Sequence, residues 1–175
     1  LARQAIDEGV KRFIFLSSVK VLGEETKEGG CFTETSKYAP RDAYSISKMN
    51  AELGLRELSG SGLDLTIIRS PLIYGPGVKA NFGALLKAAQ LDLPLPLGSI
   101  KNERSLVYLD NLNDLISVCL VNKKAIGKTY LVSDDEDVST PQLVHYMRKA
   151  LNRKKSGLMP LPIGLLKVGL GLLGK

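Results

Sequence analysis

Lys11-Arg-Phe-Ile-Phe-Leu-Ser-Ser18 is the segment that most directly indicates the fold class, because a strand–helix–strand unit begins there. Its short continuous apolar run predicts a buried strand over 12–17. A helix is expected over 42–58, with an aspartate at its N-cap position and the stop signal Ser-Gly-Ser-Gly at 59–62. The apolar run 63–69 predicts the next strand. Two strands joined by a long crossover helix run parallel, so the sequence predicts an α/β fold.

Further elements are expected on both sides of this unit. A short helix is predicted at 1–8, a loop at 23–40 and extended chain at 93–97. The later part of the chain predicts helices at 81–91, 110–121, 139–151 and 162–173, with short strands at 104–109 and 129–132.

The composition is typical of a globular protein and excludes several function classes. The chain has 175 residues, of which 44% are hydrophobic and 24% charged. Its net charge of +6 is scattered over short basic pairs and triplets, and it contains no tryptophan. We therefore expect solvated basic faces and no nucleic-acid partner.

The sequence gives no indication of a metal site or of a membrane-spanning segment. Cys31, Cys119 and the single His145 fit no zinc spacing, so no metal site is predicted. Two free thiols suit a reduced compartment, and we expect a cytoplasmic protein. The apolar segment 163–175 is too short to span a bilayer, so it predicts a packed helix rather than stable membrane insertion.

Tyr44-Ser-Ile-Ser-Lys48 is the motif that points to chemistry. A tyrosine and a lysine four residues apart lie on one face of a helix. A neighbouring ammonium group favours the phenolate form of a tyrosine. The hydroxyls of Ser17 and Ser18 follow the first strand, and ligands of open α/β sheets bind at strand carboxyl ends. Together these groups suit removal of a proton from an alcohol while hydride leaves its carbon.

Further segments accompany this motif in a fixed order. They are Phe-Ile-Phe-Leu-Ser-Ser-Val-Lys-Val-Leu-Gly-Glu (13–24), Phe32-Thr33-Glu34, Pro40 four residues before Tyr44, Arg69-Ser-Pro-Leu-Ile-Tyr-Gly-Pro-Gly77 and Arg104-Ser-Leu-Val-Tyr-Leu-Asp110. Over essentially the whole chain, this set resembles the extended branch of the short-chain dehydrogenase/reductase superfamily. Within that branch it is similar to the NAD-dependent nucleotide-sugar epimerases and dehydratases.

The resemblance implies a domain plan. Residues 1–70 would form the second half of a Rossmann-type parallel sheet, the carboxyl-terminal part of the dinucleotide-binding domain. Residues 71–175 would form mainly a small α/β substrate domain, with 104–121 packing back on the first. No strand followed by a glycine-rich turn and helix opens the chain. It therefore resembles the carboxyl-terminal part of a larger protein, and we expect it to be inactive alone.

The resemblance also implies roles for individual residues. Catalysis would fall to Ser18, Tyr44 and Lys48, with Ser17 as a rival for the hydroxyl of Ser18. Cofactor contacts would come from Ser17, Tyr44, Lys48, Pro71 and Tyr74, and substrate contacts from Lys20, Asn81, Leu95 and Arg104. The implied cofactor is NAD, and the choice between NAD and NADP stays open because the residues that select it lie outside this chain.

Two positions beside the serine narrow the expected reaction. Sugar 4,6-dehydratases of this family place an Asp-Glu pair there, whereas this chain has Val19 and Lys20. Neither side chain can act as a carboxylic acid, which favours epimerisation at C4 through a ketone. Two alternatives stay open: a reductase or dehydrogenase acting on another alcohol or ketone, and a non-catalytic binding protein of the same fold.

The implied partner is a nucleoside-diphosphate sugar, with a UDP-sugar favoured. A helix start at Asn81 and the guanidinium of Arg104 suit diphosphate oxygens, although a surface ion pair of Arg104 with a nearby carboxylate is the alternative. Lys20 either meets an acidic or N-acylated sugar or points to solvent. By the same resemblance, the full-length protein is expected to form a homodimer, with the helix at 42–58 as the candidate face.

Overall fold

A computed structural model describes residues 1–27, 29–58, 60–91, 93–153 and 157–161. The helices are α1 (Ala2–Asp7), α2 (Ala43–Glu57), α3 (Ala80–Gln90), α4 (Leu109–Val121) and α5 (Thr140–Ala150), with short 3-10 helices η1 (Val19–Leu22) and η2 (Lys123–Ala125). The strands are β1 (Arg12–Ser18), β2 (Asp64–Ser70), β3 (Leu72–Tyr74), β4 (Leu106–Tyr108) and β5 (Thr129–Leu131). The helix predicted at 162–173 lies outside the described residues.

The main sheet is parallel and has the strand order β1-β2-β5. β1 and β2 pair over their full lengths, from Arg12 opposite Asp64 to Ser18 opposite Ser70. The predicted strand–helix–strand unit and the α/β fold class are therefore confirmed. The register also brings the carboxyl ends of both strands to the same edge, so their serines and Arg69 lie side by side.

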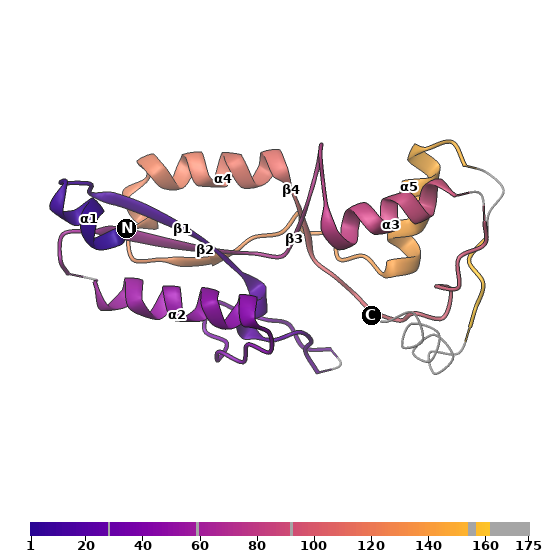
Figure 1. Ribbon diagram of the computed structural model, residues 1–175, viewed down its shortest axis with the longest axis horizontal. Coiled ribbons are helices and arrows are strands. Elements are labelled where there is room, and N and C mark those ends of the chain that lie inside the picture. Colours follow the sequence, from indigo (N-terminus) through magenta and orange to yellow (C-terminus); the bar gives the residue numbers. More distant parts are fainter. Residues whose placement is uncertain (28, 59, 92, 154–156, 162–175) are drawn as a thin grey trace. The chain divides into compact units, whose positions relative to one another are not determined.

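Helices α2 and α4 cover opposite faces of this sheet (Figure 1). Side chains alternate between the two faces along each strand. The core on the α2 side of the sheet contains Leu55, Leu65 and Ile67 with Phe13, Phe15 and Ala2. The core on the α4 side contains Ile68, Val107, Leu112, Cys119 and Ala125, with neighbours that include Ile14 and Leu16. Burial on both faces explains why β1 and β2 read as continuous apolar runs.

One strand and both 3-10 helices were not predicted from the sequence. β3 has three residues and follows β2 after the single residue Pro71; it pairs with β4 in a second, two-stranded sheet. Such a short strand carries no readable alternation, and its residues fall within a Pro- and Gly-containing segment. η1 follows Ser18 directly and ends at Gly23, whose φ of 136° disfavours any residue with a Cβ atom.

The chain divides into two compact units. The first comprises Leu1–Ile73 and Val107–Asp134; the second comprises Tyr74–Leu106 and the described residues from Asp135 onward. Within the second unit, α3 packs against α5, and the backbone of Arg104 pairs with that of Val138. The roles of the units in binding cofactor and substrate stay predictions.

None of the helices in the described part of the chain is long and apolar enough to cross a membrane. Within that part, no group of three or more histidine, cysteine, aspartate or glutamate residues is arranged to hold a metal ion. Both cysteines are free thiols; Cys31 is exposed, and Cys119 lies on α4 with its side chain buried. Burial raises the pKa of the Cys119 thiol, as is usual for a structural cysteine.

Candidate functional site

The start of α2 is fixed by a reciprocal capping box. The Asp42 carboxylate accepts a hydrogen bond from the backbone N–H of Ser45 at 2.6 Å, and the Ser45 hydroxyl oxygen accepts one from the Asp42 N–H at 3.1 Å. These bonds satisfy two of the donors that every helix N-terminus leaves open. They therefore fix where the first turn begins, and this turn carries Tyr44.

Tyr44 and Lys48 lie on one face of α2, next to the end of β1. The Lys48 ammonium donates a hydrogen bond to the Leu16 carbonyl oxygen at 2.9 Å. It lies 5.9 Å from the centre of the Tyr44 ring and 5.0 Å from that of Phe15. The Tyr44 side chain is 54% exposed, and among the described residues its hydroxyl has no hydrogen-bond partner. The Tyr44 phenol therefore lies beside the Lys48 ammonium and is accessible to a ligand.

The two serines at the end of β1 are both buried but have different surroundings. By strand alternation Ser17 shares the face of Phe13 and Phe15, and its hydroxyl helps to lower the pKa of the buried Glu52 carboxyl. The Ser18 hydroxyl oxygen accepts a hydrogen bond from the Lys20 N–H at 3.3 Å. Its own proton can still be donated to another oxygen. This difference favours Ser18 over Ser17 as the hydroxyl that meets a substrate.

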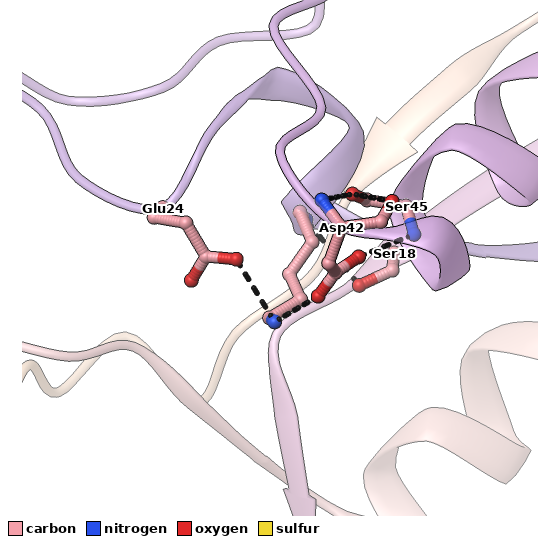
Figure 2. Close-up of polar contacts among 5 residues, drawn as sticks. Ser18, Glu24, Asp42 and Ser45 are labelled. Atoms are coloured by element: carbon pink, nitrogen blue, oxygen red, sulfur yellow. Dashed lines mark hydrogen bonds and ion pairs between the residues drawn. The ribbon is translucent and has the colours of Figure 1, made fainter.

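The Lys20 side chain links η1 to the start of α2, since its ammonium lies between the carboxylates of Glu24 and Asp42, both labelled in Figure 2. Its ammonium lies 2.8 Å from an Asp42 carboxylate oxygen and 3.0 Å from a Glu24 oxygen. The hydrogen bond from Lys20, helped by those from Ser45, holds the pKa of Asp42 far below its usual range. The bonds to Asp42 and Glu24 in turn raise the pKa of Lys20. Lys20 is therefore charged at neutral pH and braced between two carboxylates.

A buried ion pair beneath this site was missed by the sequence analysis. Glu52, one turn after Lys48, is fully buried and pairs with the equally buried Arg69 of β2 at 2.8 Å. The Tyr38 hydroxyl donates to the same carboxylate at 2.7 Å. Two signals were available: a glutamate four residues after Lys48 and beside the apolar positions Ala51 and Leu55, and a lone arginine ending an apolar strand.

The remaining predicted ligand residues are found as follows. Pro71 links β2 to β3, and the Tyr74 ring stacks on Phe82 with centroids 5.7 Å apart. Asn81 is exposed in the first turn of α3. The Leu95 N–H and C=O bond to Gly157 and Met159, so its side chain, not its backbone, is left for a ligand.

Arg104 is exposed. Among the described residues its guanidinium forms no ion pair, so the alternative of a surface pair with Glu103 or Asp110 is not realised there. Asn81, Leu95 and Arg104 belong to the second unit, whereas the serines, Tyr44 and Lys48 belong to the first.

The residues around Tyr44 fit the nicotinamide end of NAD. Only one of the three N–H donors of Lys48 is used by the described part of the protein, at the Leu16 carbonyl. The other two can bind ribose hydroxyls beside the exposed Tyr44 phenol. NAD would supply a hydride acceptor and donor at this position.

In comparisons with known proteins, the chain is similar to named epimerases. Over its whole length the chain is 48% identical to a UDP-glucose 4-epimerase of Vibrio cholerae, of which it covers 54%. It is 33% identical to the N-acetyl-alpha-D-glucosaminyl-diphospho-ditrans,octacis-undecaprenol 4-epimerase of Escherichia coli O157:H7, over 90% of this chain and 48% of that protein. The chain therefore spans about half the length of these curated relatives.

A solved structure has the same fold. The UDP-glucose 4-epimerase of Thermus thermophilus, in complex with NAD, matches with a TM-score of 0.72 at 18% identity, over 95% of this chain and 60% of that one. The model of the NAD dependent epimerase/dehydratase family matches residues 1–133, which include the Tyr44–Lys48 pair and both serines. This chain belongs to the NAD dependent epimerase/dehydratase family.

Proposed function

We propose that the full-length protein is an NAD-dependent epimerase that inverts C4 of a nucleoside-diphosphate sugar through a 4-keto sugar. The observation that carries the proposal is the Lys48 ammonium, held 2.9 Å from the Leu16 carbonyl and 5.9 Å from the Tyr44 ring. It places a fixed positive charge beside an exposed phenol at the carboxyl end of a parallel strand. This is where ligands bind in open α/β sheets.

The proposed roles follow from the chemistry of each side chain. Tyr44 takes the proton from the C4 hydroxyl during oxidation and returns it during reduction. Ser18 donates a hydrogen bond to the same oxygen, and Lys48 stabilises the negative charge that develops on the phenol. Since the same groups act in both directions, epimerisation requires only that the keto sugar presents its other face to the returning hydride.

The residues next to Ser18 support epimerisation over dehydration. Elimination of water from C5 and C6 requires an acid and a base beyond Tyr44. Val19 has no ionisable group, and the Lys20 ammonium is paired with Asp42 and Glu24. Two 4-epimerases among the relatives agree with this choice.

For the substrate we propose a UDP-sugar, whose diphosphate is bound through Arg104 and the first turn of α3 near Asn81. The exposed guanidinium of Arg104 suits phosphate oxygens. Leu95 would offer apolar surface to the base. The proposed homodimer would use α2, where Ile46 and Leu53 are 43% and 42% exposed.

The test is interconversion of UDP-glucose and UDP-galactose by the full-length protein, followed through the anomeric proton signals without added NAD. We expect Tyr44→Phe to lower kcat by about 10²- to 10⁴-fold, the usual contribution of a general acid–base. Tyr146→Phe, which removes an exposed hydroxyl on α5, serves as the matched control and should leave kcat unchanged.

Other outcomes would assign a different function. Net consumption of NADH or NADPH with a ketone substrate would identify a reductase. Full activity of Tyr44→Phe would refute the assigned acid–base role. Binding of a UDP-sugar with no turnover under any condition would favour a non-catalytic member of the family.

A further inference from the structure

We propose that Glu52 and Arg69 are positioning residues. They set the register of α2 against the sheet and thereby hold the Lys48 ammonium beside the Tyr44 ring. The proposal rests on the proposed function only for its kinetic readout. Neither residue reaches the exposed surface where Tyr44 meets a ligand, since Glu52 is 0% and Arg69 2% exposed. Both therefore act through other groups.

The pair is held by several hydrogen bonds. Arg69 Nε donates to both Glu52 carboxylate oxygens, at 3.1 and 3.3 Å, and Nη2 donates to one of them at 2.8 Å. Nη1 donates to the Glu34 carbonyl at 3.1 Å. The Tyr38 hydroxyl donates a further hydrogen bond to the Glu52 carboxylate at 2.7 Å. The Tyr38 ring lies 5.1 Å from the guanidinium carbon of Arg69. The pair thus joins α2, β2 and the loop before α2.

These contacts fix α2 along its axis and about it. Tyr44, Lys48 and Glu52 follow at intervals of four residues, so they form one row on the helix. Lys48 is tied to the backbone of β1 at Leu16, and Glu52 is tied to Arg69, which lies opposite Ser17 in the sheet. Two attachments one turn apart oppose sliding and rotation of the helix near Tyr44.

A contribution to stability alone does not explain why Glu52 and Arg69 form a buried ion pair. Removing two charges from water is costly, and a well-packed apolar pair is often at least as stabilising as a buried ion pair. Buried ionic groups can instead specify one geometry among several similar packings. Among the described residues of α2, Leu55 is the only buried apolar side chain, so few apolar contacts define the register of this helix. A bidentate ion pair supplies that definition.

The decisive variant replaces both charges with apolar side chains, Glu52→Leu with Arg69→Met, in the full-length protein. The matched control is Thr66→Val, a polar-to-apolar change at a fully buried site of β2, where Thr66 bonds the Ala125 carbonyl. We expect the double variant to remain folded, with kcat lowered about 100-fold and KM changed less than about threefold. Misplacement of a catalytic group by about 1 Å has effects of this size.

A second readout does not depend on turnover. Lys48 can be acetylated by acetic anhydride and quantified by mass spectrometry, with the exposed Lys87 of α3 as internal reference. We expect Lys48 to react severalfold faster in the double variant, because its ammonium is released from the Leu16 carbonyl. Lys48 in Thr66→Val should react as in the wild type.

The outcomes separate this proposal from the proposed function. Wild-type kcat or unchanged Lys48 reactivity in a folded double variant would overturn the positioning role. A wild-type protein that fails to interconvert UDP-hexoses would overturn the proposed function, while acetylation still tests the positioning. If circular dichroism shows the double variant unfolded, the isosteric Glu52→Gln is judged by the same two measurements.

Discussion

At the scale of single residues, the charged groups near the site fall into two kinds. Lys20 and Asp42 are partly exposed, 42% and 41% by side chain, and their ion pair is screened by solvent. Glu52 and Arg69 are buried, and each would be costly to bury without the other. The Lys20–Asp42 pair therefore connects η1 to α2 at the protein surface, whereas the Glu52–Arg69 pair connects α2 to β2 in the protein interior.

Lys20→Ala tests whether this lysine meets a sugar or supports the start of α2. The ammonium is already paired with Asp42 and Glu24, so we expect similar losses of kcat/KM for UDP-glucose and for a UDP-uronic acid. The measurement is kcat/KM for both substrates, with Lys87→Ala as a control for loss of an exposed charge. A loss confined to the acidic sugar would instead identify Lys20 as its ligand.

Glu52 predicts an acid-sensitive contribution to stability. Burial raises the pKa of Glu52, but hydrogen bonds from Arg69 and Tyr38, together with the nearby Ser17 hydroxyl, outweigh burial and leave it below its ordinary value of 4.5. Because the folded pKa is lowered, its stabilisation is complete above about pH 4.5 and is lost as pH falls through the folded value. We expect Glu52→Gln to lower the free energy of unfolding at pH 7 by about 3 kcal/mol.

Urea unfolding between pH 3 and pH 7 measures this contribution. The difference between wild type and Glu52→Gln should shrink as the pH falls below about 4.5. A difference that stayed constant over the whole range would show that the Glu52 charge is not the stabilising feature.

At the scale of elements, helix starts are set by local sequence. α2 begins at the capping box Asp42–Ser45, and α5 begins at the capping box Ser139–Gln142 with Pro141 in its first turn. Such short-range signals need no tertiary partner, since the bonds close within four residues. Both helix starts were therefore predicted from the sequence.

Ser139→Ala tests the cap of α5. The Ser139 hydroxyl accepts the Gln142 N–H at 3.2 Å, and its loss should cost about 1 kcal/mol of unfolding free energy. Thermal or urea unfolding of the full-length protein measures the change. Ser117→Ala, which removes an exposed serine that bonds back to Asn113 within α4, should change it by less than about 0.5 kcal/mol. Equal effects of the two variants would contradict a capping role.

At the scale of the whole molecule, the proposed substrate residues are divided between the two compact units. The first unit carries Ser18, Tyr44 and Lys48, and the second carries Asn81, Leu95 and Arg104. If the second unit binds the diphosphate, its residues act on affinity more than on the chemical step. Kinetic constants can therefore separate the contributions of the two units.

Arg104→Ala should raise KM for the UDP-sugar about tenfold or more and leave kcat nearly unchanged, because a hydrogen bond between charged groups contributes about 1.5–3 kcal/mol. Steady-state kinetics on the full-length protein measures both constants. Lys101→Ala removes an exposed positive charge three residues away and is the matched control. A fall in kcat with unchanged KM would place Arg104 in the chemical step and contradict diphosphate binding.

Local sequence patterns were enough to predict the parallel strand pair, the long helix between the two strands and the placement of Tyr44 and Lys48 on one helix face. Apolar runs, capping residues and a four-residue interval each involve residues that are close in the sequence, so they can be recognised without knowledge of the fold. β3 was missed because its three residues, between a proline and a glycine, are too few to show the alternation of apolar and polar residues that indicates a strand.

The partners of the charged groups could not be predicted from local patterns and are seen in the folded protein. Arg69 and Glu52 are 17 positions apart, and Lys20 and Asp42 are 22 apart. Which charges meet depends on strand register and on the angle at which α2 packs on the sheet. Both are set by burial across many residues, so no local pattern encodes them.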